Sequence, residues 1–443
     1  MTTKRMHAPD LTPQPLSYEE RGARGVAIRR DGGTSPPLAG EGGRRPGEGL
    51  AAPDLTPGPS PMRRGEPEAP PSGSMSVLAL PASGRVAEGQ GGSVHRIAVV
   101  RALHLGDLLL AIPALRALRA HFAGAEITLI GLPWAEELRR RFAAYIDRFL
   151  AFPGYPGICE TDYQPRRTRR FLAAQRAYGY DLVIQMHGSG DASNPFALAL
   201  GGRVTAGYYR CACPPGLHPA ARYPDDAPEV TRNLGLARLV GCGWLEPALE
   251  FPLLAADQAE AHALLEGAPN VTATTTLIGV HASAKAPARR WPPERFAAVA
   301  DILAARFDAT IVLTGSADDS AITRAVRRHM RHTPLDLAGK TSLGALAALI
   351  ARMSLFIGND SGPAHLAEAV GTPSVTLFGP TDPRRWASLD QRAHPIVREP
   401  VGCSPCAYSD CPIDHRCLRR ITPAEVIARA SGLLLQEVTT CGA

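Results

Sequence analysis

Short apolar runs alternate with segments of helical periodicity along most of the chain. Residues 97–100 form a β-branched apolar run that predicts a buried strand, and residues 107–122 predict a helix with its leucines on one face. Residues 126–130 predict a second strand, and residues 182–185 predict a further buried one. The first three of these segments together predict a βαβ unit.

The same alternation starts again after an irregular, proline-rich segment at residues 208–226 and an apolar stretch at residues 249–254. In this second half the pattern predicts strands at residues 277–280, 310–314, 355–357 and 374–378, and helices at residues 257–266, 293–306, 319–330, 343–353 and 423–438. Two successive series predict an α/β protein with two doubly wound, Rossmann-like domains and a cleft between them. We expect these domains to cover residues 94–250 and 251–443.

Residues 1–93 show neither pattern. Gly and Pro fill 25 of the first 74 positions, and the segment APDLTPQPLSYEERG from Ala8 is echoed by APDLTPGPSPMRRGE from Ala52. Such a composition predicts a disordered tail. The degenerate repeat is similar to translated intergenic DNA, so we expect translation of the natural protein to start near Met75.

Composition narrows the class of protein. The 443 residues are 45% hydrophobic and 20% charged, and no apolar run approaches the ~18 residues of a membrane-spanning helix. No apolar signal-peptide segment follows the first basic residues, so we expect a cytoplasmic protein. The net charge of +6 permits anionic partners without demanding nucleic acid. Arginines cluster at residues 139–141 and 166–170, either as a solvated face or as a contact with an anionic membrane surface or phosphorylated acceptor.

Several candidate ligand-binding residues lie in residues 359–383. The sequence of this segment, NDSGPAHLAEAVGTPSVTLFGPTDP, places polar loops at both ends of an apolar strand. Ligands of open α/β sheets bind at the carboxyl ends of the strands. Asp360 and Ser361 come just before a helix that begins near Pro363, whose N-terminal N–H groups attract an anion such as a phosphate. The alternative interpretation is that one of these two side chains only caps the helix.

The loop after the first predicted strand differs from the familiar nucleotide-binding loops. It reads RALHLGDLLLAIPAL, with neither GxGxxG nor GxxxxGK[ST], which disfavours a dinucleotide-dependent oxidoreductase or a P-loop enzyme. Gly106 permits a close approach of another group, and Asp107 stands at the start of the helix. Asp107 is therefore either a plain helix cap or a carboxylate presented to a ligand.

Four segments in this order resemble glycosyltransferase family 9, the ADP-heptose:lipopolysaccharide heptosyltransferases. They are LHLGDLLLAIPALRAL, RRWPPERF, LAGKTSLGALAALIARMSLFIGNDSGPAHLAEAVGTPSVTLFGPTDP and a late cysteine cluster. The resemblance runs from about Arg96 to Val438. It implies a GT-B fold, with two Rossmann-like domains and an interdomain cleft, and metal-independent, inverting transfer of a sugar from a nucleotide-sugar to a lipid-linked acceptor.

On the acceptor side, Asp107 falls on the family's LGD aspartate. The resemblance implies that Asp107 is the general base, which takes the proton of the acceptor hydroxyl as its oxygen attacks the anomeric carbon. Inversion in one step needs such a single carboxylate. A helix N-terminus lowers the basicity of a carboxylate, so desolvation by the bound acceptor would have to offset that effect.

On the donor side, the resemblance implies a set of residues that bind the nucleotide-sugar: Ser283, Lys285, Arg289, Thr341, Ser342, Asp360, Ser361, Gly362 and His365. Arg289 stands where the family pattern has a lysine, and an arginine is able to clamp a diphosphate with two hydrogen bonds. Residues 341 and 342 would meet the nucleobase mainly through their backbone. Without the resemblance, basic side chains in such a loop are more often solvated.

Four of the nine cysteines follow the spacing C-x2-C-x4-C-x5-C: Cys403, Cys406, Cys411 and Cys417. In a cytoplasmic protein this spacing indicates either a structural metal site, with zinc or an iron–sulfur group bound, or reduced or occasionally oxidised thiols. For catalysis itself the resemblance implies no cofactor.

These observations predict an inverting glycosyltransferase that moves a heptose or related sugar, with ADP-heptose the first candidate donor, to a lipopolysaccharide core or similar lipid-linked glycan. We expect it to lie at the inner face of the inner membrane as a peripheral protein that binds an anionic membrane surface and no nucleic acid. Two alternatives remain: a GT-B-like nucleotide-sugar epimerase, and a non-catalytic module that binds nucleotide-sugars.

Overall fold

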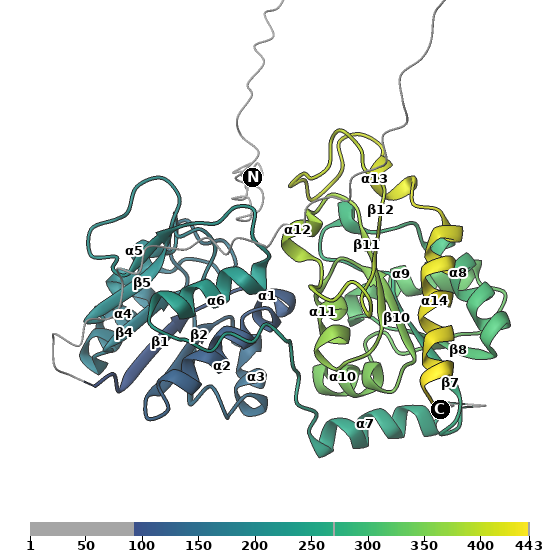
Figure 1. The fold of residues 1–443 in the computed structure, drawn as a ribbon, viewed down its shortest axis with the longest axis horizontal. Helices are drawn as coiled ribbons and strands as arrows, with labels where there is room; N and C mark the ends of the chain where they lie inside the picture. Colours follow the sequence, from purple (N-terminus) through teal and green to yellow (C-terminus); the bar gives the residue numbers. More distant parts are fainter. Residues whose placement is uncertain (1–92, 269–270, 442–443) are drawn as a thin grey trace, which may run out of the picture. The chain divides into compact units, whose positions relative to one another are not determined.

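The computed structural model describes residues 93–268 and 271–441. The expected tail, apart from its last residue, and the expected start near Met75 lie outside the described residues. Within the described chain, two six-stranded, parallel sheets form the core, and helices cover them (Figure 1). The predicted α/β class with two doubly wound sheets is therefore confirmed.

The first sheet has the strand order β3-β2-β1-β4-β5-β6. Its strands are β1 (Arg96–Val100), β2 (Glu126–Gly131), β3 (Arg148–Ala151), β4 (Leu182–Gln185), β5 (Val204–Tyr209) and β6 (Ala220–Arg222). Ile97 and Val99 belong to one apolar cluster, whereas Ala98 and Val100 belong to another, and all four are fully buried. Both faces of the sheet are thus covered, which is why its central strands are continuous apolar runs.

The second sheet repeats this topology, with the order β12-β11-β10-β7-β8-β9. Its strands are β7 (Thr276–His281), β8 (Ala309–Leu313), β9 (Leu335–Asp336), β10 (Leu355–Asn359), β11 (Ser374–Phe378) and β12 (Ile396–Arg398). In each sheet the first and fourth strands of the series are neighbours. The chain reverses its winding direction at that point, where doubly wound sheets bind ligands.

The helices around the first sheet are α1 (Leu105–Leu109), α2 (Ile112–His121), α3 (Glu136–Arg141), α4 (Pro165–Tyr178), α5 (Asn194–Ala199) and α6 (Glu229–Leu239), with the 3-10 turn η2 (Pro133–Ala135). The single helix predicted at residues 107–122 is wrong, because the chain breaks between α1 and α2. Pro113 lies at the start of α2, where its missing N–H costs nothing, whereas within one long helix its ring would clash with the preceding turn.

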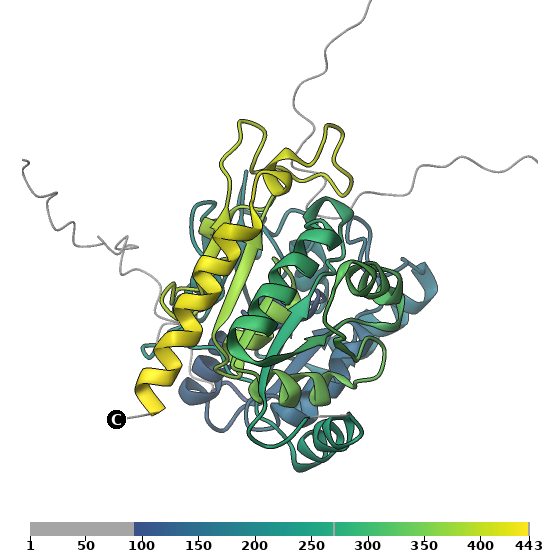
Figure 2. The same cartoon turned by 90° about the vertical axis from the view of Figure 1, so that its right-hand side faces the viewer.

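The helices around the second sheet are α7 (Ala255–Glu266), α8 (Pro293–Phe307), α9 (Ser320–His329), α10 (Leu343–Ala351), α11 (Gly362–Ala369), α12 (Pro383–Trp386), α13 (Arg416–Arg419) and α14 (Pro423–Cys441), with the 3-10 turns η3 (Pro287–Arg289) and η4 (Ala317–Asp319). Figure 2 shows α14 along the sheet, where it packs against α8, β10 and β11. The predicted last helix is confirmed.

Two further expectations need correction. The segment 208–226 is not wholly irregular, because it contains the end of β5 and the edge strand β6. Arg141 does not lie on a solvent-exposed face as one interpretation of the arginine cluster expected. It is buried, and it donates to the carboxylate of Asp257 and to the carbonyl of Pro252 at 2.7 Å. The four arginines of α4, at positions 166, 167, 169 and 170, are exposed as that interpretation requires.

No helix among the described residues is both long and apolar enough to cross a membrane. The proposed boundary between domains at residue 250 stays a prediction. It falls in residues 240–254, which contain no helix or strand and connect α6 to α7.

Candidate active site

The first turns of α1 and α11 lie against each other. A Cβ atom added to Gly106 would lie only 2.8 Å from Cδ2 of His365, and one added to Gly362 would lie 3.2 Å from Cβ of Leu105. Glycine at both positions is what allows this approach. The LGD segment after β1 and the DSGPAH segment after β10 therefore lie against each other, although about 250 residues separate them in the sequence.

Asp107 occupies the third position of α1. Its Oδ2 accepts the backbone N–H of His104 at 3.3 Å, as in a capping box, and the side chain is half-buried. The side chain of Arg101 fixes the backbone here by donating to the Asp107 carbonyl at 2.8 Å. The N-cap of α1 is His104 and not Asp107, which instead accepts from the N-cap backbone from the third helical position; the role of Asp107 as a base stays a prediction.

Asn359, which was not singled out from the sequence, joins the loops after β7 and β10. Its Oδ1 accepts the backbone N–H of Trp291 at 3.0 Å, and its Nδ2 donates to the Ala282 carbonyl at 2.9 Å. Both Asn359 and Trp291 are fully buried. This pair of bonds fixes the RRWPP segment beside the DSGPAH segment, so the two expected donor-binding loops are held together.

Asp360 and Ser361 follow Asn359 directly. Asp360 is 5% exposed, and its Oδ2 is buried without a hydrogen-bond partner among the described residues. Ser361 is the N-cap of α11, yet its hydroxyl donates to the Asn359 carbonyl at 3.2 Å instead of capping the helix. A buried carboxylate oxygen without a partner is costly, which makes Asp360 Oδ2 a candidate acceptor for a ligand hydrogen bond.

The other predicted donor residues lie on the loops after β7 and β9. The Ser283 hydroxyl is buried and donates to Asp319, a bond that helps to lower the pKa of that carboxyl, whereas burial acts in the opposite direction. Lys285 is exposed and its Nζ lies 2.5 Å from Nε2 of His104, so it reaches the first turn of α1. Arg289 is half-buried at the end of η3.

Thr341 and Ser342 lie just before α10. The Ser342 hydroxyl caps that helix by accepting from the N–H of Ala345 at 3.1 Å, and it donates to Glu260 of α7 at 2.7 Å. Its hydroxyl is therefore engaged in the fold, consistent with the expectation that this segment would meet a ligand mainly through its backbone. A nucleobase contact here stays a prediction.

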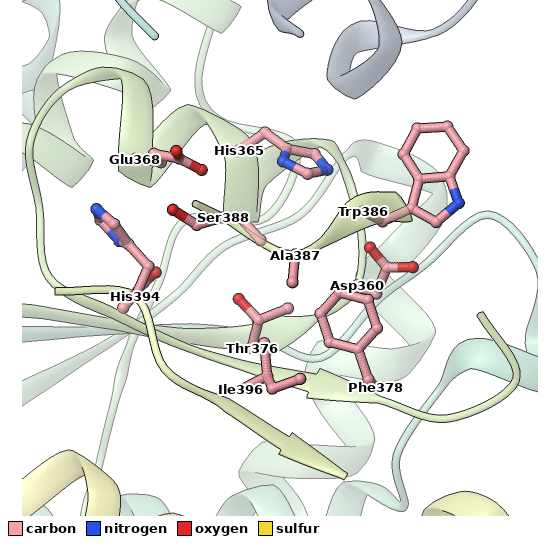
Figure 3. A pocket seen from close by; sticks show the side chains of 12 residues that line it. Asp360, His365, Glu368, Thr376, Phe378, Trp386, Ala387, Ser388, His394 and Ile396 are labelled. Atoms are coloured by element: carbon pink, nitrogen blue, oxygen red, sulfur yellow. The ribbon is translucent and has the colours of Figure 1, made fainter. Parts of the chain in front are cut away.

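A small hollow, partly open to solvent, is lined in part by Asp360 and His365 (Figure 3). In this view Asp360 lies beside Phe378 and Trp386, whereas Glu368 and His394 lie at the other end. His394 pairs with the Ser374 hydroxyl at 2.9 Å, and burial lowers its pKa, so it is neutral at pH 7. The lining is mostly polar, with Phe378, Trp386 and Ile396 as its large apolar side chains.

Three arginines gather around Glu229 next to the Asp107 segment, which one of them, Arg101, contacts; this cluster was not predicted from the sequence. Glu229 accepts from Arg101 at 3.2 Å, from Arg232 at 3.1 Å and from Arg385 of α12 at 3.0 Å. Burial raises the pKa of Glu229, but the combined charge of the three guanidinium groups has the larger effect and lowers that pKa to about 2. One carboxylate thus balances three cations, and Arg385 joins α12 to α6.

The four late cysteines do not form a metal site in the structure. Among the described residues, no three or more His, Cys, Asp or Glu side chains are arranged to hold a metal ion. Cys417 is buried, which raises its pKa, whereas Cys403 is exposed. The structural zinc considered from the spacing is therefore not confirmed.

Comparison with known proteins gives consistent results. The sequence model described as "Glycosyltransferase family 9 (heptosyltransferase)" matches residues 168–416. The lipooligosaccharide heptosyltransferase 2 of Campylobacter jejuni is 31% identical over 150 residues, which are 33% of this chain and 47% of that protein. The chain spans less than half the length of the first curated relatives it matches.

Solved structures share the fold. A family 9 glycosyltransferase from Veillonella parvula superposes with a TM-score of 0.65 and 24% identity, covering 78% of this chain and 99% of that one. The structure entitled E. coli ADP-heptose lps heptosyltransferase II gives 0.61 and 22%, covering 77% and 99%. These likenesses extend over both sheets, and the family model covers more than half of the sequence. The chain therefore belongs to glycosyltransferase family 9, the heptosyltransferase family.

Proposed function

We propose that this protein is an inverting glycosyltransferase that transfers a heptose from ADP-heptose to the core sugars of a lipopolysaccharide or a similar lipid-linked glycan. The observation that carries the proposal is the contact between α1 and α11, which brings Asp107 to the same place as the DSGPAH segment. A base for the acceptor and a site for the donor must be adjacent for a direct displacement. The donor and acceptor classes are those after which similar heptosyltransferases are named.

Different residues serve the acceptor and the donor in this reaction. The acceptor oxygen attacks the anomeric carbon, its proton passes to a carboxylate oxygen of Asp107, and the bond to the diphosphate breaks with its electron pair on the departing ADP. Lys285, Arg289 and the N-terminus of α11 oppose the charge that develops on this leaving group. Asp360 and His365 hold hydroxyl groups of the sugar; the Asp360 Oδ2 atom, which has no partner among the described residues, is available to accept a hydrogen bond from one of them.

A direct transfer assay tests the proposal. Purified protein is incubated with ADP-heptose and lipopolysaccharide that lacks its heptose residues, and the product is weighed by mass spectrometry. We expect a gain of one heptose, and calorimetry with ADP, GDP and UDP should show preference for ADP. Absence of transfer with this donor and acceptor would overturn the proposal.

The two alternatives give different outcomes in the same assay. A nucleotide-sugar epimerase would exchange the hydrogen at C2 of the sugar with solvent deuterium and would not need an acceptor; the family match does not favour it. A non-catalytic module would bind ADP with no turnover of any nucleotide-sugar.

We expect Gly106→Ala to reduce transfer roughly 10- to 100-fold, since small displacements of reacting groups have effects of this size. The added methyl group would collide with the His365 ring, and that ring would have to move. Steady-state kinetics and circular dichroism together check this prediction. Gly124→Ala is the matched control, because a Cβ there meets no atom within 4 Å. Equal rates for the two variants would contradict the proposed role of this contact.

We further propose that transfer needs no metal ion and that the protein works at an anionic membrane surface in the cytoplasm. Activity is expected to be unchanged after treatment with EDTA and dialysis, as measured by ADP release. Zinc analysis of the same dialysed sample decides between the two interpretations of the cysteines: stoichiometric zinc supports a structural site, whereas its absence supports free thiols. The exposed arginines of α4 support the membrane contact.

A further inference from the structure

Arg385, in α12, is a charged side chain to which the proposed reaction assigns no role. Its Nε donates to Oε2 of Glu229 at 3.0 Å, and its guanidinium carbon lies 4.3 Å from the centre of the Trp386 ring. The side chain is 24% exposed, and its Nη1 and Nη2 atoms make no hydrogen bond with the described residues. The guanidinium is therefore fixed through one edge, whereas its other end is open to a partner.

Glu229 does not depend on Arg385 for its neutralisation. Arg101 bonds to Oε1 of Glu229 at 3.2 Å, and Arg232 bonds to Oε2 at 3.1 Å. Both of these arginines are buried, and every nitrogen of their guanidinium groups donates a hydrogen bond within the fold. Arg385 is thus the third cation around one carboxylate, and it is the one that has donors left over. A local excess of positive charge attracts an anion.

The next arginine in the sequence has its own acids. Arg384 bonds to Asp382 at 2.7 Å and lies 3.5 Å from Asp226, and its side chain is 66% exposed. These two carboxylates therefore balance Arg384. Among the described residues, Arg385 forms its ion pair with Glu229, which it shares with two other cations.

Direct contacts connect Arg385 to both parts of the candidate site. Glu229, which fixes Arg385, also bonds to Arg101, and Nε of Arg101 donates to the Asp107 carbonyl at 2.8 Å. On its other side the guanidinium stacks on Trp386, which is one of the residues that line the hollow (Figure 3). The charge of Arg385 is thus held next to the segment of the proposed base and next to the wall of the hollow.

We propose that Arg385 is a substrate-binding residue of the transfer site, which holds a phosphate or carboxylate group of a substrate through Nη1 and Nη2. The inference rests on the proposed function. These two nitrogens match the spacing of two oxygens in such a group, and the bond from Nε to Glu229 orients them in advance. Two sources offer this chemistry: the diphosphate of the donor, and an acidic group of the acceptor glycan.

The experiment is calorimetric titration of wild type and Arg385→Gln, with ADP and, separately, with de-acylated, heptose-deficient lipopolysaccharide. Glu229 keeps Arg101 and Arg232 in this variant, so the melting temperature should fall only slightly. Loss of two charge-assisted hydrogen bonds should weaken the binding of one ligand roughly 10- to 100-fold and leave the other unchanged. Weaker binding of ADP assigns the bound group to the donor, and weaker binding of the lipopolysaccharide assigns it to the acceptor.

Two further variants separate binding from a structural role. Arg384→Gln makes the same change at the neighbouring, exposed arginine and should keep both dissociation constants. Arg385→Lys keeps the charge beside Glu229, but an ammonium group does not offer two parallel bonds, so binding of the same ligand should still weaken, by a smaller factor. This variant decides the matter if the glutamine lowers the melting temperature strongly.

The inference and the proposed function fail in different ways. Unchanged dissociation constants for both ligands in Arg385→Gln and Arg385→Lys overturn the inference, and so does an equal loss for both ligands, which indicates a structural role. Neither result affects the proposed function. That function is overturned by a wild-type protein with no transfer, whereas the titrations need no turnover.

Discussion

Asp107→Asn is expected to lower the rate of heptose transfer by about 10²- to 10⁴-fold, the usual contribution of a general base. The asparagine removes the proton acceptor but retains a side-chain oxygen that caps α1, so the helix should persist. Donor binding should therefore be nearly unchanged, because the proposed donor contacts lie on the loops after β7, β9 and β10. The measurements are ADP release at saturating donor and acceptor, and calorimetric titration with ADP.

The control for this variant is Asp162→Asn, at an exposed loop position. It makes the same chemical change away from the site and should retain full activity. Near-wild-type activity of Asp107→Asn would show that another group takes the proton. Loss of ADP binding together with transfer would instead indicate that Asp107 holds the site in shape.

Glu229→Gln is expected to destabilise the protein by roughly 3–5 kcal/mol, which is typical when one partner of a buried ion pair is removed. Arg101, Arg232 and Arg385 would then be left without their shared carboxylate. The free energy of unfolding from urea titrations at pH 7 measures the effect, and Glu137→Gln is the exposed control. A loss below about 1 kcal/mol, as surface substitutions give, would contradict the importance of the cluster.

The pH dependence of stability gives a second measure of the same group. The pKa of Glu229 is lowered from 4.5 to about 2 in the folded protein. Its contribution to stability is therefore fully present above pH 4.5 and is lost as the pH falls towards 2, a difference of about 3 kcal/mol. Between these pH values wild type should lose more stability than Glu229→Gln, since the amide does not titrate.

The sequence predicted the central strands well, because those of the first sheet are buried on both faces and therefore read as unbroken apolar runs. Edge strands such as β9, with two residues, and β6, with three, are too short for any periodicity to stand out. Helix α4 was missed for another reason. It is rich in arginine and buries little besides Thr168, Leu172 and Gln175, so its apolar face is too narrow to be recognised.

The loops of the candidate site followed from topology, since residues after first and fourth strands meet in a doubly wound sheet. The resemblance to family 9 singled out Asp107, Ser283 and His365, and topology explains why their loops lie at the same edge of each sheet; their chemical roles stay predictions. Glu229 and Arg385 were not recognised. Their importance comes from a contact between residues that are 156 positions apart in the sequence, and no local pattern records such a contact.

The bond from Arg385 to Glu229 also limits how this enzyme can be rebuilt. Recombining the donor-side half of one relative with the acceptor-side half of another is an obvious route to new sugar transfer, because the two sheets are separate along the sequence. The seam of such a hybrid would run through this ion pair. If the two proteins that are combined lack a matching acid and base at these two positions, the hybrid would contain a buried, unpaired charge. Compatibility at these positions should therefore be checked before a change of specificity is attempted.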